Sequence, residues 1–143
     1  MTDFSNAREM TALGVRIRVL SSCGAHTVLD YVAPPGFDGV RPHYHAVSTE
    51  WFRVLDGRMA FEFPDGVRLA GAGDFVEVAP RRVHKWRNAD PDRALAFLFG
   101  FDRAGMEGYF QNLLTLATES PVWPPSDPSV LARLGAAYDT FSA

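Results

Sequence analysis

Three histidines and one glutamate stand at positions in the sequence that could hold a metal ion. His43 and His45 form a His-x-His pair, Glu50 follows after four intervening residues, and His84 comes after a turn that contains Pro80. Side chains alternate along a strand, so the paired histidines point the same way and can reach one ion about 2 Å from each nitrogen. Three imidazoles and a carboxylate would leave an octahedral ion two exchangeable positions. The sequence therefore predicts a mononuclear metal site.

The strands that carry these residues must converge. Residues 46–49 are enough for the chain to turn, so Glu50 can return on a neighbouring strand, on the same face as the apolar Phe52. His84 shares a strand face with Trp86. The other face carries Lys85 and Arg87, whose charges suit solvent. The pattern therefore directs both Glu50 and His84 inward.

Short strands and closely spaced turns dominate the chain. Asp56-Gly57 is a hairpin signal, which predicts that residues 58–63 pair back onto residues 50–55. Strands of this length and spacing predict an all-β fold, a sandwich or jelly-roll barrel. The predicted strands cover residues 15–19, 26–33, 42–47, 50–55, 58–63, 67–69, 75–78, 83–88 and 95–101.

The periodicity becomes helical only after residue 104. Residues 104–118 are predicted to form an amphipathic helix on the outside of the barrel, with Met106, Tyr109, Phe110, Leu113 and Leu116 on its apolar face. Asp127 and Pro128 are suited to the N-cap and first position of a second short helix. We therefore divide the chain into an N-terminal arm (1–13), a β-barrel (14–103) and a C-terminal helical extension (104–143).

Two sequence motifs resemble those of the cupin superfamily. The first, G(x)5HxH(x)3-4E(x)6G, is matched by the two paired histidines, Glu50 and Gly57, with its leading glycine displaced to Gly39 or Gly36. The second, G(x)5PxG(x)2H(x)3N, is matched by Gly73, Pro80, His84 and Asn88, but Arg82 replaces a glycine and the proline lies one residue nearer the histidine. Neither departure removes a metal ligand.

The resemblance covers roughly residues 14–120 and is to small single-domain cupins similar to quercetin dioxygenase-like monocupins. It implies a double-stranded β-helix, or jelly-roll, barrel with two short C-terminal α-helices, and a homodimer. It also implies that His43, His45, His84 and Glu50 bind one divalent ion, which could be Fe, Mn, Ni, Co or Zn. In quercetinase-like chemistry Glu50 is a ligand that can detach to act as the catalytic base, and the substrate enolate reacts with dioxygen.

Other functions are compatible with the same ligands. A metal-dependent isomerase or lyase would use the ion as a Lewis acid without oxygen, and a non-catalytic barrel could bind a small molecule or sense a metal. A His-x-His pair can also be purely structural, with two partly buried histidines that bind no metal and hydrogen-bond to their neighbours. His26, which no spacing links to the cluster, is assigned a surface or structural role.

Aromatic and other large apolar side chains could line a substrate pocket or simply fill the barrel, and the sequence does not separate these two roles. The predicted pocket residues are Phe52, Met59, Phe61, Phe63, Trp86, Phe97 and Phe99.

Composition is that of an ordinary globular domain. With 143 residues, of which 47% are hydrophobic, the chain can bury one core but not two. A net charge of -3 gives no field for binding nucleic acid. The absence of an apolar run of about 18 residues, and of a hydrophobic signal region, predicts no membrane association and a cytoplasmic protein. The partner expected from the metal site is a small-molecule substrate. Cys23 is the single cysteine, which excludes an internal disulfide.

Overall fold

Alternating apolar side chains build the larger of the barrel's two facing layers, which is a single sheet. In the computed structural model, which describes residues 8–143, six strands form an antiparallel sheet in the order β1-β2-β3-β10-β5-β8. Along β5 the side chains of Glu50, Phe52 and Val54 are buried, as the alternation predicts. The strands are β1 (Arg8–Ala12), β2 (Val15–Cys23), β3 (His26–Ala33), β5 (Glu50–Asp56), β8 (Phe75–Val78) and β10 (Leu95–Phe101).

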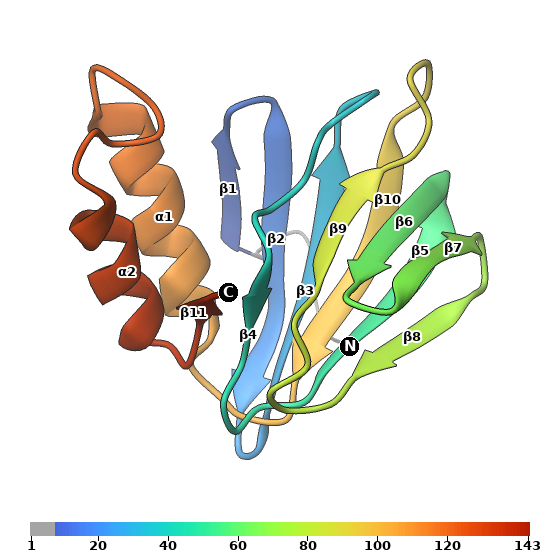
Figure 1. Cartoon of the computed structure of the whole chain (residues 1–143), viewed down its shortest axis with the longest axis horizontal. Helices are drawn as coiled ribbons and strands as arrows, with labels where there is room; N and C mark the ends of the chain where they lie inside the picture. The colour runs from blue at the N-terminus through green and yellow to red at the C-terminus, as the bar shows by residue number, and fades with distance from the viewer. Residues whose placement is uncertain (1–7) are drawn as a thin grey trace.

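The opposite layer contains two smaller sheets. One has the strand order β7-β6-β9, and the other pairs β11 with β4 (Figure 1). Their bounds are β4 (His43–Tyr44), β6 (Arg58–Phe63), β7 (Gly66–Gly71), β9 (Lys85–Asn88) and β11 (Phe141–Ser142). The predicted jelly-roll fold class, with two helices after the barrel, is confirmed.

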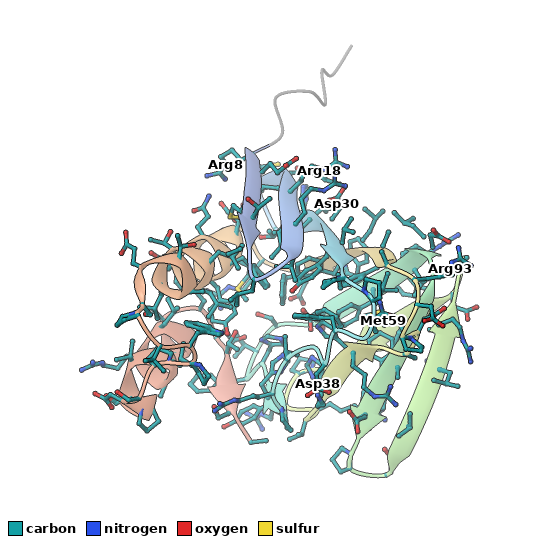
Figure 2. All side chains as sticks on the ribbon, turned by 90° about the horizontal axis from the view of Figure 1, so that it is seen from above. Arg8, Arg18, Asp30, Asp38, Met59 and Arg93 are labelled. Carbon is teal, nitrogen blue, oxygen red and sulfur yellow. The ribbon has the colours of Figure 1, made fainter. Side chains whose placement is uncertain are left out.

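The hydrophobic core lies between these layers. Phe61 of β6 packs on Phe52 of β5 with ring centroids 5.0 Å apart, and Trp86 of β9 packs on Phe97 of β10 at the same separation. Figure 2 shows Met59 among the side chains of the interior, and this residue is 0% exposed. Contacts between the two layers therefore provide the barrel's main stabilisation.

The predicted hairpin between residues 50–55 and 58–63 is wrong. Strand β5 pairs with β10 and β8, whereas β6 pairs with β7 and β9 in the opposite layer. Both edges of β5 are occupied by strands that come later in the chain, so β6 has to cross to the other sheet. Gly57, with φ of 97°, makes this crossing, and a Cβ there would lie 2.8 Å from the carbonyl oxygen of Ala94.

Several strand bounds differ from the sequence prediction: β2 extends to Cys23, β7 covers Gly66–Gly71, and β9 begins at Lys85, just after His84. Strand β1 lies within the range assigned to the N-terminal arm and pairs antiparallel with β2. Its burial is too irregular to give an alternation signal. Strand β4 ends at Tyr44 instead of Val47, so His45 is the first residue of a loop.

Two helices lie beside the barrel, next to β1 and β11 (Figure 1). Helix α1 (Glu107–Glu119) starts three residues later than predicted, and α2 (Pro128–Ala136) has the predicted N-cap, since the Asp127 carboxylate accepts from the amide of Ser129. The fully buried residues of α1 are Leu114 and Ala117, whereas the predicted Leu113 and Leu116 are only partly buried. No helix among residues 8–143 is both long enough and apolar enough to span a membrane.

Candidate metal centre

Backbone pairing brings the two histidine motifs together. The amide of His43 donates to the carbonyl of His84 at 3.0 Å, and the amide of His84 donates to the carbonyl of His43 at 2.9 Å. This isolated bridge joins β4 to the residue that precedes β9. The two imidazole rings consequently lie side by side, with their centroids 4.3 Å apart.

His45 and Glu50 complete the cluster from the two ends of one loop. Glu50 is the first residue of β5, and its Oε1 atom lies 2.9 Å from Nε2 of His84 and 3.4 Å from Nε2 of His45. One ligand atom from each of the four predicted residues lies within 4.8 Å of the others. The structure therefore brings all four predicted metal ligands together.

The cluster is buried, and His43 is its most exposed member. His84 is 0% exposed, His45 4% and Glu50 5%, whereas His43 is only partly buried. Phe101 contacts His45 edge-on, and Phe52 lies beyond His84. The other three ligand candidates are therefore better shielded from water than His43.

Each imidazole is oriented by a main-chain carbonyl at its Nδ1 atom. A carbonyl oxygen can only accept, so Nδ1 carries the proton, and a neutral ring then presents the lone pair of Nε2. Such bonds fix both the tautomer and the direction of histidine ligands. The pairs are His43 with Arg41 at 2.8 Å, His45 with Asp139 at 3.0 Å, and His84 with Arg82 at 3.0 Å.

The electrostatics of the cluster favour an ionised glutamate. Burial would raise the pKa of Glu50, but hydrogen bonds from His45 and His84 outweigh burial and lower it to about 2. Burial would lower the pKa of His45, but the hydrogen bond to Glu50 and the charge of Glu50 leave it raised. Burial, together with the neighbouring His84, lowers the pKa of His43 to about 4.

The nitrogen and oxygen atoms of this cluster are suitable ligands for a divalent cation. With Nδ1 protonated, the short contacts of Glu50 with His45 and His84 are hydrogen bonds only when those rings are doubly protonated imidazolium ions. When the rings are neutral, Nε2 lone pairs and a carboxylate oxygen converge without a hydrogen between them. A shared cation would satisfy all of these groups, and imidazole with carboxylate suits iron, manganese, cobalt, nickel or zinc.

The predicted pocket residues lie in the core of the barrel. Six of the seven are at most 5% exposed and belong to one continuous hydrophobic cluster, and Phe63 packs against that cluster as a partly buried residue. Phe52 is the one among them whose ring lies near a metal-ligand candidate, edge-on to His84 with the ring centroids 6.4 Å apart.

Two other predicted positions lie away from the cluster. His26 is exposed, and its Nε2 atom lies 2.8 Å from the hydroxyl of Ser21, which agrees with a surface role. Cys23 is an exposed free thiol on the same hairpin. Neither side chain is among the four that converge.

Asp139 and Thr140 contact the cluster but were missed from the sequence. They lie 94 and 95 residues after His45, in a segment whose pattern indicated only the end of a helix. No spacing links a contact of this range to the histidine motifs. The sequence signal that could have raised attention is a lone acidic residue after an apolar helix, which is too common to be informative.

A comparison with protein-family models identifies the family of this fold. The model described as "Cupin domain" matches residues 30–100, a segment that contains all four clustered ligands. This chain belongs to the cupin superfamily. No curated protein matches the sequence of this cupin significantly.

Solved structures resemble this cupin in fold. A sugar phosphate isomerase of the cupin superfamily from Silicibacter pomeroyi is 18% identical, with a TM-score of 0.63 and coverage of 73% of this chain and 76% of its own. The polyketide cyclase RemF from Streptomyces resistomycificus is 16% identical, with a TM-score of 0.60 and coverage of 71% and 77%. The nucleoside dehydratase Pac13, from Streptomyces, is 16% identical, with a TM-score of 0.58 and coverage of 73% and 82%.

Proposed function

We propose that this cupin is a mononuclear divalent-metal enzyme that acts on a small aromatic or enolate-forming substrate. The observation that carries the proposal is the convergence of one ligand atom from each of the three histidines and a Glu50 oxygen within 4.8 Å, with every Nδ1 atom bonded to a carbonyl. Structural histidines rarely need three free lone pairs directed at one point. A metal centre requires this arrangement.

His43, His45, His84 and Glu50 would hold the ion. When bound, a divalent metal supplies Lewis acidity that stabilises a substrate oxyanion, and a redox-active metal can also activate dioxygen. The partly buried His43 marks the open side, where a substrate with a hydroxyl group next to a carbonyl would enter.

Glu50 is the proposed proton acceptor. The carboxylate is ionised near neutral pH, and when His45 and His84 are neutral it loses the hydrogen bonds that lower its pKa. It can then take the proton of a substrate hydroxyl, or of a carbon next to a carbonyl, onto a carboxylate oxygen. The surrounding Phe52 and Phe101 rings exclude water and suit an apolar or aromatic substrate.

Helix α1 carries a partly buried phenol whose pKa is influenced by the charge of the glutamate. Burial raises the pKa of Tyr109, and the negative charge of Glu50 adds to this effect. A tyrosine is already protonated at neutral pH and this shift moves its pKa further away, so the phenol would serve as a hydrogen-bond donor to a substrate oxygen.

Two reactions are compatible with the same proton transfer. The first is a dioxygenase-type oxidation, in which the enolate reacts with dioxygen, as the three-histidine and one-glutamate set of quercetinase-like cupins suggests. The second is isomerisation, cyclisation or elimination without oxygen. Its support is that the similar solved structures include an isomerase, a cyclase and a dehydratase.

Elemental analysis followed by oxygen-electrode and proton-exchange assays would test this proposal. Flavonols, catechols and dicarbonyl compounds would be screened in the presence of each candidate metal. Metal-dependent oxygen uptake supports the dioxygenase. Solvent deuterium incorporation or product formation without oxygen uptake supports the second reaction. A protein that binds no divalent metal in any condition would contradict both.

A further inference from the structure

Residues 138–143 lie outside the segment matched by the cupin model, yet they contact the metal-ligand candidates. In β11, Phe141 pairs with Tyr44 and Ser142 pairs with His43, and the amide of Ala143 donates to the carbonyl of Pro42. Figure 1 shows β11 between the helices and β4, at the side of the barrel. This segment therefore holds the strand that carries the first histidine motif.

The Asp139 carboxylate binds the loop that joins His45 to Glu50. It accepts hydrogen bonds from three consecutive amides, those of Ala46 at 2.9 Å, Val47 at 3.1 Å and Ser48 at 2.9 Å. It also accepts from the hydroxyl of Ser48 at 2.7 Å. Since one carboxylate satisfies so many donors, it fixes the conformation of this loop and hence the separation of its two ends.

The main chain of the same residue orients a ligand. The carbonyl of Asp139 accepts from Nδ1 of His45 at 3.0 Å, and the hydroxyl of Thr140 lies 3.3 Å from the same nitrogen. Asp139 is 8% exposed and has a φ of 52°, in the left-handed region that aspartate tolerates better than most residues. Its side chain and carbonyl thus act on two neighbouring parts of the site.

Helix α2 anchors this arrangement. The amides of Tyr138 and Thr140 both donate to the carbonyl of Gly135 at 2.9 Å. A Cβ at Gly135 would lie 2.5 Å from the carbonyl oxygen of Thr140, so the chain can turn back this tightly only at a glycine. The helical extension therefore has a physical link to the metal-ligand candidates.

We propose that Asp139 is a positioning residue of the metal centre. It holds the 46–48 loop through its carboxylate and directs Nε2 of His45 at the cation site through its carbonyl. This inference rests on the proposed metal site. Outer hydrogen-bond partners of metal ligands typically contribute roughly 10- to 100-fold to metal affinity, and we expect a loss of this size when the carboxylate is neutralised.

The test compares zinc affinity in full-length Asp139→Asn with that in wild type and in Asp102→Asn. Asp102 is a matched control because its carboxylate accepts from one amide of the same loop, that of Thr49 at 2.9 Å, and contacts no histidine. Competition with a chromogenic chelator gives the affinity. The visible spectrum of the cobalt-loaded protein reports the coordination geometry, which a purely structural role would leave unchanged.

We expect Asp139→Asn to bind zinc roughly 10- to 100-fold more weakly with an altered cobalt spectrum, and Asp102→Asn to match wild type. A lower Tm of Asp139→Asn with unchanged zinc affinity and cobalt spectrum would overturn the inference and leave the proposed function intact. Failure of the wild type itself to bind zinc or cobalt would instead overturn the proposed function and this inference with it.

A second variant covers the case in which Asp139→Asn does not fold. Ser48→Ala removes one hydroxyl contact with the Asp139 carboxylate and leaves the three amides in place. We expect a smaller loss of zinc affinity in the same direction. Affinity equal to that of wild type in folded Ser48→Ala would count against the loop as a determinant of the site.

Discussion

His43 and His84 exchange both of their backbone hydrogen bonds, at 3.0 and 2.9 Å, although they belong to different sequence motifs. Because main-chain atoms set this pairing, the two imidazoles stay adjacent whether or not a cation is present. The site is thus largely organised before metal binds, which lowers the conformational cost of binding.

His84→Ala should abolish tight metal binding and leave the barrel folded. The variant removes one ligand, so affinity should fall by more than the roughly 10- to 100-fold that outer partners contribute. Its backbone bridge to His43 remains, and we expect a stability loss of about 1–3 kcal/mol. Elemental analysis and thermal unfolding check both points, with the exposed His26→Ala as control. Full metal retention in His84→Ala would remove it from the ligand set.

Glu50→Gln should suppress proton transfer more than folding. The amide cannot accept the substrate proton as a base, so we expect metal-dependent deuterium exchange of a bound substrate to slow by about 100-fold or more. The matched control is Glu77→Gln, which changes an exposed carboxylate on β8, the strand adjacent to β5. Equal exchange rates in Glu50→Gln and wild type would show that another group is the base.

The stabilising effect of metal should increase with pH. In the metal-free protein the raised pKa of His45 means that its protonated form adds stability below the reference value of 6.5, and this contribution is lost as pH rises through the raised value. Deprotonation frees Nε2 for a cation at the same time. His43, with a pKa lowered to about 4, is already neutral in this range, and Glu50 is ionised.

The zinc-induced increase in Tm should therefore be larger at about pH 8 than at about pH 5.5. Differential scanning calorimetry of the loaded and metal-free protein measures it. The same increase at both values would indicate that protons and metal do not compete for these ligands.

Gly39→Ala should destabilise the barrel strongly. A Cβ at Gly39 would lie 1.6 Å from the carbonyl oxygen of Trp86, a backbone atom in β9 that cannot move aside. Gly24→Ala is a matched control, since both glycines have positive φ but nothing lies within 4 Å of a Cβ at Gly24. We expect about 1–2 kcal/mol for the control, from backbone strain alone, and a clearly larger loss for Gly39→Ala by chemical denaturation.

Sequence pattern was enough for the fold class and for the four converging ligands. Alternation in residues 50–55 and the spacing of the two histidine motifs depend on local geometry, which a single sequence carries directly. The pairing of β6 could not be obtained this way, because Asp56-Gly57 suits a hairpin as well as a crossing between sheets. Which edges of β5 are free is decided by β8 and β10, later in the chain.

The role of Asp139 was equally inaccessible. The carboxylate of Asp139 binds the amides of residues 46–48, which every residue type except proline carries, and the hydroxyl of Ser48. Its carbonyl accepts from Nδ1 of His45, but the His-x-His motif does not indicate which carbonyl lies there. Long-range capping of a loop by a carboxylate becomes visible only when the chain is folded.

The acceptors that orient the three imidazoles are peptide oxygens, and every amino acid has one. Arg41 and Arg82 could each be exchanged for another residue without deleting the oxygen that fixes the tautomer of its histidine, whereas at Asp139 the carboxylate has a second role in the loop. Substitutions at such positions therefore leave the orientation of the histidine rings unchanged as long as the backbone conformation is kept. Distant relatives with very different surfaces can preserve an equivalent centre, and new substrates can be accommodated by changing side chains around a geometry that stays constant.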